Sequence, residues 1–396
     1  MKNNNLLLEF SLYLWQMLPK KLHNKLEERK ANHAFRQLGQ NNDLVDFSSN
    51  DYLGFSKSEA IFNSSHQYLL DSGVITNGAT GSRLLSGNHQ LYTQVEQELS
   101  HMHKSDGVLI CNSGYDANIG LLSSVAQRGD VILYDELIHA SLRDGIQMSH
   151  AKSYKFKHNN LQDLDNQCEI HRNKISEDAS IYIVTESVFS MDGDSPDLQA
   201  LSEFSSRTNT YLIIDEAHAV GVFNLGLVQN LGLEKAVFAR IITFGKALGC
   251  HGAAILGSAD LKDYLINFSR SFIYTTALPP HSLATISTAY KALNHSEARE
   301  QLQANIEHFK NEIRKNGLSE MFIQSASAIH CGIISGNKQV KQISKHLQSK
   351  GFDVKPILSP TVPKGKERLR FCLHSYNSKA EISEVLRLLA TFVNQA

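Results

Sequence analysis

Short apolar segments alternate with longer amphipathic ones from about residue 88 to residue 257, and this alternation constrains the fold more than any other feature. Short apolar runs predict buried strands, and the longer segments between them have the apolar spacing of helices. We expect strands at 107–111, 131–134, 153–156, 181–185, 211–214, 241–244 and 253–256, and helices at 88–104, 115–126, 140–148, 161–171 and 198–205. Strands separated by helices form a mainly parallel sheet with helices on both faces, so the sequence predicts an α/β fold.

The pattern changes on both sides of this region. Residues 20–38 read as a charged helix, and a short strand is expected at 44–47. Past Pro279-Pro280, long polar helices from about 281 to 315 precede strands at 329–334 and 369–373. We therefore expect three parts, which are an N-terminal helical segment (1–45), a large α/β domain (46–285) and a smaller C-terminal α/β domain (286–396).

The composition excludes several classes of protein. Hydrophobic residues make up 42% of the 396 residues, which is enough for a substantial core, and the net charge of −1 gives no basic field for nucleic acid. Five scattered cysteines without a C-x-x-C favour a reduced, cytoplasmic protein without a metal site, and His101 and His103 are expected on a helix surface. The apolar stretch 6–18 is too short to span a bilayer and is expected to pack on protein rather than on a membrane.

Polar residues directly follow the predicted strands, where ligands of such sheets bind. These loops are 112–115, 135–139, 186–190, 215–218 and 245–246. The D-E-A-H at 215–218 alone would suggest a helicase, but no phosphate loop G-x-x-x-x-G-K-[S/T] precedes it. A carboxylate, a lysine, an imidazole and a glycine at a helix N-terminus together suit pyridoxal 5′-phosphate, because they can hold its ring nitrogen, aldehyde, ring face and phosphate.

With further segments, these loops resemble the α-oxoamine synthase family of fold-type I pyridoxal-phosphate enzymes. The matching segments are 46–54 (DFSSNDYLG), 81–87 (GSRLLSG), 113–115 (SGY), 139–141 (HAS), 187–193 (SVFSMDG), 215–218 (DEAH), 243–246 (TFGK), 274–276 (YTT), and 361–363 (TVP) through Arg370. The likeness extends from about residue 20 to the C-terminus. It implies a fold-type I transferase with a mainly parallel central sheet and a smaller C-terminal α/β domain.

The resemblance also implies roles for individual residues. Lys246 would form the Schiff base with the cofactor and move the substrate Cα proton, and Asp215 would pair with the pyridinium nitrogen. His218 would hydrogen-bond the phenolic oxygen and His139 would stack on the ring. The remaining cofactor contacts are expected from Ser190 at the phenolic oxygen, and from Gly114, Tyr115, Thr243, Thr275 and Thr276 at the phosphate, with a threonine coming from the other subunit of a homodimer. Substrate contacts are expected from Arg370, which would grip the amino-acid carboxylate, and from Asn50 and Arg36.

The implied reaction is a decarboxylating condensation of an amino acid with an acyl thioester. The nearest likeness implies L-alanine and a pimeloyl thioester, on CoA or acyl-carrier protein, in biotin biosynthesis. Three alternatives stay open, namely glycine or serine with another acyl donor, aminotransfer on the same fold, and a silent partner subunit, which the presence of Lys246 disfavours. Two departures from the family bear on specificity: Leu358 replaces a frequent arginine, and the loop 221–227 is short.

Overall fold

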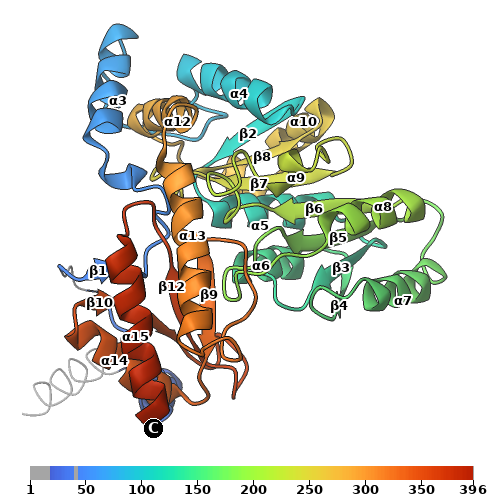
Figure 1. Ribbon diagram of the computed structural model, residues 1–396. Helices are drawn as coiled ribbons and strands as arrows, with labels where there is room; N and C mark the ends of the chain where they lie inside the picture. Colours follow the sequence, from blue (N-terminus) through green and yellow to red (C-terminus); the bar gives the residue numbers. More distant parts are fainter. Residues whose placement is uncertain (1–17, 40–42, 396) are drawn as a thin grey trace, which may run out of the picture.

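The computed structural model describes residues 18–39 and 43–395, and within them the central element is a seven-stranded sheet (Figure 1). The strands lie in the order β2 (Gly107–Cys111), β8 (Ala253–Gly257), β7 (Ala239–Thr243), β6 (Tyr211–Asp215), β5 (Ile181–Glu186), β3 (Val131–Asp135) and β4 (Lys152–Phe156). β8 runs antiparallel to both of its neighbours, and the other neighbouring pairs are parallel. The prediction of a mainly parallel sheet is therefore confirmed, and each predicted strand lies close to its expected position.

Helices cover both faces of the sheet because successive strand residues point to opposite sides. In β6, Ile213 packs in a core cluster with α5 (Gly114–Val125) and α6 (Ala140–Met148). Its neighbours Leu212 and Ile214 pack in a second cluster, under the helices on the other face. The other helices of this region are α3 (Glu59–Asp71), α4 (Gln90–His103), α7 (Leu161–Arg172), α8 (Leu198–Thr208), α9 (Leu227–Asn230), α10 (Ala259–Phe268), α11 (Arg270–Ile273) and α12 (Pro280–Leu293).

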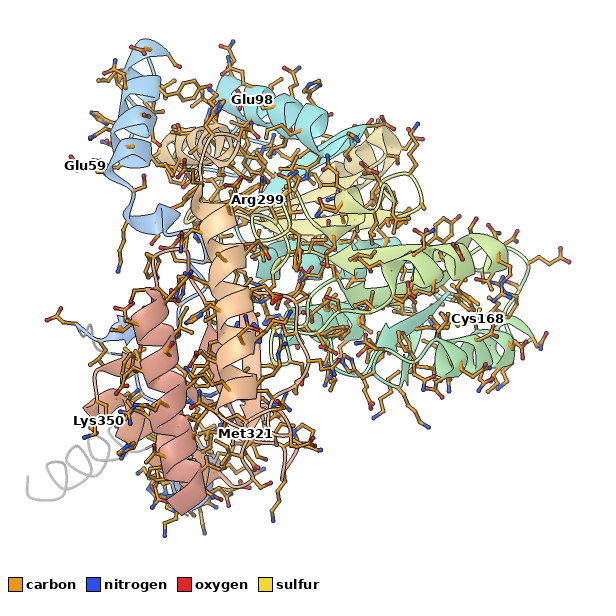
Figure 2. The ribbon with its side chains drawn as sticks, viewed as in Figure 1. Glu59, Glu98, Cys168, Arg299, Met321 and Lys350 are labelled. Carbon is orange, nitrogen blue, oxygen red and sulfur yellow. The ribbon has the colours of Figure 1, made fainter. Side chains whose placement is uncertain are left out.

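One helix prediction on α4 is wrong. His101 is exposed as expected, but His103 is fully buried, and its Nε2 lies 2.9 Å from the hydroxyl of Tyr290 on α12. His103 follows the buried Leu99 by four residues and so lies on the same inward helix face. A second contact joins α4 to α12. Ser287 Oγ of α12 donates to the Glu98 carboxylate of α4 at 2.6 Å, and Glu98 is labelled in Figure 2.

The C-terminal part contains an antiparallel sheet in the order β11 (Lys355–Ile357), β12 (Arg368–Cys372) and β9 (Ile329–Ile333). The helices α13 (Ala298–Lys315), α14 (Asn337–Ser349) and α15 (Lys379–Gln395) pack on it, and α13 and α15 lie side by side (Figure 1). One core cluster runs from the large sheet through α12 into this part. The division of the chain at residues 45 and 285 stays a prediction.

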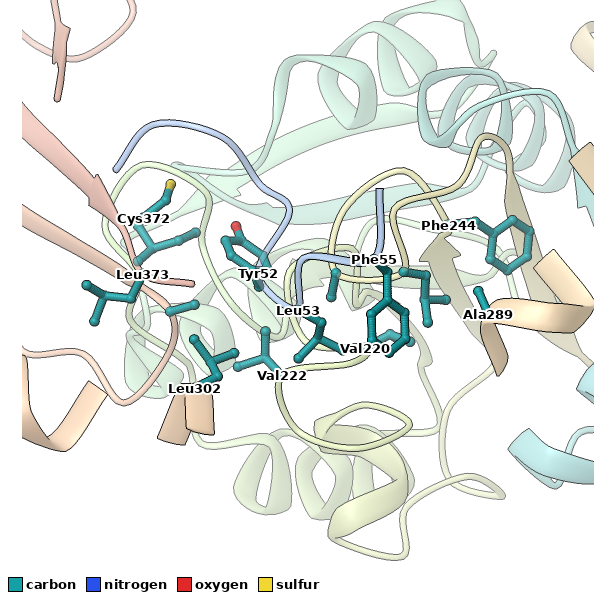
Figure 3. Close-up of a cluster of buried hydrophobic side chains, with 14 of the residues drawn as sticks. Tyr52, Leu53, Phe55, Val220, Val222, Phe244, Ala289, Leu302, Cys372 and Leu373 are labelled. Carbon is teal, nitrogen blue, oxygen red and sulfur yellow. The ribbon is translucent and has the colours of Figure 1, made fainter. Parts of the chain in front are cut away.

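The segment 45–57 packs against both the large sheet and the C-terminal part. β1 (Val45–Asp46) pairs in parallel with β10 (Phe352–Asp353), and the backbone N–H of Ser375 donates to Tyr52 O at 2.8 Å. Figure 3 shows Tyr52, Leu53 and the 3-10 turn that begins at Phe55 (Phe55–Lys57) among side chains from distant parts of the chain. The helix α2 (Lys20–Ala31) lies before this segment and has no buried residue.

The apolar stretch 6–18 lies, except for Leu18, outside the described residues. Its packing on protein stays a prediction. In the part of the chain that the structure describes, no helix is both long enough and apolar enough to cross a membrane.

Candidate active site

The polar residues expected at the strand ends do converge. Asp215 and Glu186 are the last residues of the adjacent strands β6 and β5, and they are partners in the strand register. His139 follows the end of β3 by four residues, and Lys246 follows the end of β7 by three. Because these strands are parallel neighbours, their carboxyl ends meet at one edge of the sheet.

The Asp215 carboxylate accepts hydrogen bonds from two donors. Its Oδ1 accepts from the backbone N–H of Ala217 at 2.9 Å, and its Oδ2 accepts from the amide of Asn118 at 2.8 Å. The same amide donates to Ser141 Oγ at 2.9 Å. Sequence reasoning did not identify Asn118, although it lies one helical turn after Gly114 on α5. Since Asp215 is only 5% exposed, these contacts fix the direction in which it presents its charge.

His139 begins the helix α6 and is oriented through both its backbone and its ring. Its backbone N–H donates to Glu186 Oε1 at 2.5 Å, and its Nδ1 accepts from the backbone N–H of Ser141 at 3.2 Å. Desolvation lowers the pKa of His139 below its ordinary value. The imidazole is thus neutral near pH 7, and a neutral ring can lie against a flat heterocycle without bringing a further charge.

Lys246 and Glu186 are a perturbed pair in the centre of the site. Burial lowers the pKa of Lys246 to about 8, although the charges of Asp215 and Glu186 act in the opposite direction. Burial and the negative charge of Asp215 raise the pKa of Glu186 to about 8. A lysine with such a pKa can accept a proton near neutral pH, as a general base must. Glu186, which is 3% exposed, was not among the predicted site residues.

A hydrogen-bonded chain links His218 to Arg370. His218 Nδ1 lies 2.7 Å from the Tyr52 hydroxyl, which donates to Asn50 Oδ1 at 3.1 Å. The same oxygen accepts from Arg370 Nη2 at 3.0 Å. Burial and the charge of Lys246 hold the pKa of His218 well below its usual range, so the ring is neutral. The structure therefore brings together two of the three predicted substrate residues, and it adds Tyr52 to them.

Arg36, the third predicted substrate residue, lies apart from this chain of contacts. Its Nη2 donates to Thr361 Oγ1 at 3.4 Å, and it lines a cavity of about 570 Å³. His139 and Ser190 line the same cavity, so the cavity reaches the polar residues at the strand ends. Leu358 does not line it and packs, partly buried, against the main core cluster.

The start of α5 lies beside Thr243. A Cβ added to Gly114 would lie 3.8 Å from Thr243 Oγ1, so the hydroxyl faces the first helical residue. Ser113 caps the helix by accepting from the backbone N–H of Asp116 at 3.1 Å. The remaining N–H groups of the first turn therefore fit a phosphate, and the Thr243 hydroxyl beside them donates to Gly252 O at 3.2 Å. The side chain of Tyr115 points elsewhere, because its hydroxyl donates to Asp144 at 2.8 Å.

The predicted threonines lie close to the start of α5 within their own chain. The amide of Asn112 donates to Thr275 Oγ1 at 3.0 Å and to Thr276 O at 2.6 Å. Asn112 directly precedes the Ser113 cap. Whether a threonine also reaches the phosphate of a second subunit stays a prediction.

The 187–194 loop, which carries Ser190, is held by the imidazole of His158. The ring Nδ1 lies 2.9 Å from Asp135 Oδ1, and Nε2 lies 2.8 Å from Asp194 Oδ2. Burial alone would lower the pKa of His158, but the hydrogen bonds to both carboxylates outweigh it and raise the pKa to about 10. A charged imidazole thus joins the end of β3 to the end of this loop.

The C-terminal part grips the same loop from the other side. Ser327 Oγ donates to Gly193 O at 2.8 Å, and Arg368 forms a buried ion pair with Asp192. Arg370 Nε donates to Ser190 O at 2.8 Å. The loop therefore fixes Arg370 relative to the residues at the end of the large sheet.

The short loop 221–227 closes over a buried ion pair. Arg240 Nη2 and Glu216 Oε2 lie 2.6 Å apart, and both side chains are almost fully buried. Gly226 lies against the Glu216 carboxylate with a φ of +109°, a conformation that favours glycine. Arg299 of α13, labelled in Figure 2, donates to Asn224 Oδ1 at 2.7 Å. The loop thus packs on the C-terminal part.

This arrangement fits pyridoxal 5′-phosphate: a buried carboxylate, a lysine, a neutral imidazole and a helix N-terminus lie at one sheet edge. Within the described residues, no group of His, Cys, Asp or Glu is arranged to hold a metal ion. The fold and the site define a fold-type I pyridoxal-phosphate enzyme. Residues 42–389 match the family described as aminotransferase class I and II, and the chain belongs to this family.

The relatives narrow the family further. The chain is 40% identical over 370 residues to the 8-amino-7-oxononanoate synthase of Emericella nidulans, and the match covers 89% of this chain and 90% of that protein. A crystal structure of 8-amino-7-oxononanoate synthase from Francisella tularensis is 27% identical with a TM-score of 0.74, over 90% of this chain and 99% of that one. A serine palmitoyltransferase structure with its PLP internal aldimine is 26% identical with a TM-score of 0.82, over 89% and 88% of the two chains. The resemblance to the α-oxoamine synthases is confirmed.

Proposed function

We propose that this protein is a pyridoxal-phosphate-dependent acyltransferase that condenses L-alanine with a pimeloyl thioester to give 8-amino-7-oxononanoate, CO2 and the free thiol. The observation that carries the proposal is the position of Arg370 and Asn50 near Lys246 and Asp215, together with a cavity that His139 and Ser190 line. The 40% identity to a synthase of that name supports the choice of substrates.

Asp215 and His139 would prepare the cofactor for the reaction. When bound, pyridoxal 5′-phosphate supplies a protonated ring that delocalises the electron pair left at the substrate Cα. Asp215, fixed by Asn118, would hold the proton on the ring nitrogen. His139 would lie on the ring face, and His218, whose Nδ1 lies 2.7 Å from the Tyr52 hydroxyl, would hydrogen-bond the phenolic oxygen.

Lys246 and Arg370 would act on the amino acid. Arg370 would bind the alanine carboxylate and thereby decide which bond to Cα stands perpendicular to the ring. Lys246, with its lowered pKa, would remove the Cα proton and later return one. The Cα carbon would bond to the acyl carbon as the thiol leaves. The alanine carboxyl group would then leave as CO2.

A sister reaction is the second candidate, because serine palmitoyltransferase is a close structural neighbour. Its name implies serine and a palmitoyl donor in place of alanine and a pimeloyl donor. We also propose that the protein is a homodimer with shared sites, as the resemblance to the α-oxoamine synthases implies, with Thr275 or Thr276 contributed by the other subunit. A cytoplasmic location is proposed from the five cysteines, which are all free thiols.

The test begins with the visible spectrum of the cofactor-loaded protein, titrated separately with alanine, glycine and serine. We expect alanine to change the cofactor band at the lowest concentration, and we expect product from alanine and pimeloyl-CoA by mass spectrometry. The variant Lys246→Ala should bind cofactor without the covalent band and form no product. A spectrum that responds best to serine or glycine would move the protein to a sister synthase.

A further inference from the structure

The cavity lined by His139 and Ser190 has more cationic than acidic lining residues. Its cationic lining residues are Arg36, Arg143, Lys366 and Arg368, and its only acidic one is Asp192. Arg368 and Asp192 form an ion pair with each other. Within the described residues, Arg36, Arg143 and Lys366 have no carboxylate partner at ion-pair distance. The cavity therefore presents positive charge that nothing in the described chain neutralises.

The rest of the lining is largely apolar. Side chains of Ile138, Met191, Ile323, Ile333 and Val362 form its walls between the cationic groups. The volume of about 570 Å³ lies within the range of small-molecule sites, roughly 300–1,000 Å³. A ligand that matches this lining has an apolar middle and an anionic end.

Arg143 is anchored so that part of its guanidinium stays free. Its Nη2 donates to the backbone oxygen of Glu136, and its other donors have no partner among the described residues. The neighbouring acidic groups are occupied elsewhere, because the Glu136 carboxylate lies 3.7 Å from Lys155 and Asp144 accepts from Tyr115. Arg143 lies one helical turn after His139 at the start of α6. The two side chains are therefore on the same face of this helix, and the His139 imidazole would lie against the cofactor ring.

We propose that Arg143 and Lys366 bind the free carboxylate at the far end of a dicarboxylic acyl chain, and that they are specificity-determining residues for the acyl donor. The inference rests on the proposed function, because it assumes that the acyl chain enters this cavity. Arg143 comes from α6 and Lys366 from the loop before β12, so the carboxylate is bound between two separate elements. A guanidinium and an ammonium group recognise a carboxylate through charge-assisted hydrogen bonds.

The experiment compares two acyl donors that differ only at the far end of the chain. Pimeloyl-CoA carries a terminal carboxylate, and heptanoyl-CoA has the same number of carbons and ends in a methyl group. We would measure kcat/KM for both donors, with saturating alanine, for the wild-type holoenzyme, Arg143→Met, Lys366→Met and Arg172→Met. Arg172 is a matched control, because it also donates to one backbone oxygen, Thr208 O at 2.6 Å, and does not line the cavity.

We expect each of Arg143→Met and Lys366→Met to lower kcat/KM for pimeloyl-CoA by about ten- to a hundredfold, as the loss of a hydrogen bond to a charged group does. With heptanoyl-CoA the same variants should match the wild type, and Arg172→Met should match it with both donors. The spectral response to alanine should not change in any variant. That response shows that the cofactor site of each variant is intact.

An equal loss with both donors would overturn the inference, because it would mean that these residues bind the CoA phosphates rather than the acyl carboxylate. Unchanged kinetics with pimeloyl-CoA in both variants would overturn it as well. Both results leave the proposed function standing. If the wild-type enzyme responds to alanine but makes no product with either pimeloyl-CoA or pimeloyl acyl-carrier protein, the proposed acyl donor itself is wrong, and the inference fails with it.

Discussion

The charged imidazole of His158 should make the stability of this protein depend on pH. The ring bridges Asp135 and Asp194, and its side chain is 21% exposed, so solvent screens the contacts only in part. Its pKa rises from an ordinary value of 6.5 to about 10 in the folded protein. A group with a raised folded pKa stabilises the protein fully below its unfolded pKa, and the contribution is lost as the pH rises through the folded pKa.

The size of the effect follows from this shift. One pKa unit corresponds to about 1.4 kcal/mol, so a rise to about 10 gives on the order of 5 kcal/mol at and below pH 6.5. Between pH 7 and pH 9 the free energy of unfolding should fall by about 1.4 kcal/mol per pH unit through His158 alone. His158→Gln keeps a polar side chain but cannot carry the charge.

The assay is chemical denaturation of the holoenzyme from pH 6.5 to pH 9.5, for the wild type, His158→Gln and His101→Gln. Other groups also titrate in this range, so the measured quantity is the difference between wild type and variant at each pH. We expect the wild type to exceed His158→Gln most at pH 6.5, and the difference to shrink as the pH rises. His101→Gln, at an exposed position of α4, should show no such trend. A constant difference across the range would refute the argument that His158 is charged.

Three further substitutions test other parts of the structure. Asn118→Ala removes the amide that donates to Asp215, so we expect kcat to fall about ten- to a hundredfold. The control Asn267→Ala, on the exposed face of α10, should leave kcat unchanged. Equal kcat values for Asn118→Ala and the wild type would contradict the role of Asn118 in positioning Asp215. Glu216→Gln breaks a buried ion pair and should lower the free energy of unfolding by about 3–5 kcal/mol, against less than about 1 kcal/mol for the exposed Glu384→Gln. Gly226→Ala would place a Cβ 2.6 Å from the Glu216 carboxylate. We expect it to lower the free energy of unfolding by more than Gly232→Ala does, which should cost about 1 kcal/mol because no atom lies near Gly232. Denaturant midpoints of the two variants measure this difference, and a lower midpoint for Gly232→Ala would contradict it.

Much of the large sheet could be predicted because its signals are local. A buried strand needs only a short apolar run, and the helices between strands have their own periodicity. The position of Asp215 at the end of its strand and of Lys246 just after its strand then placed both at one edge of the sheet. His103 shows the limit of this reasoning, because its burial depends on which face of α4 meets α12.

The sequence by itself determined the order of strands and helices along the chain and the residue types at the strand ends. Each of these features depends only on residues that are neighbours in the chain. Only the tertiary structure decided which distant groups meet. Burial and the charge of Asp215 on the adjacent strand raise the pKa of Glu186. Asn50 reaches Arg370 because its segment lies beside β12, where the backbone N–H of Cys372 donates to Phe47 O at 2.8 Å. Such contacts are set by strand register and by the closing of long loops. Local sequence patterns do not encode them, because the same residues could pair in other registers until the core packs.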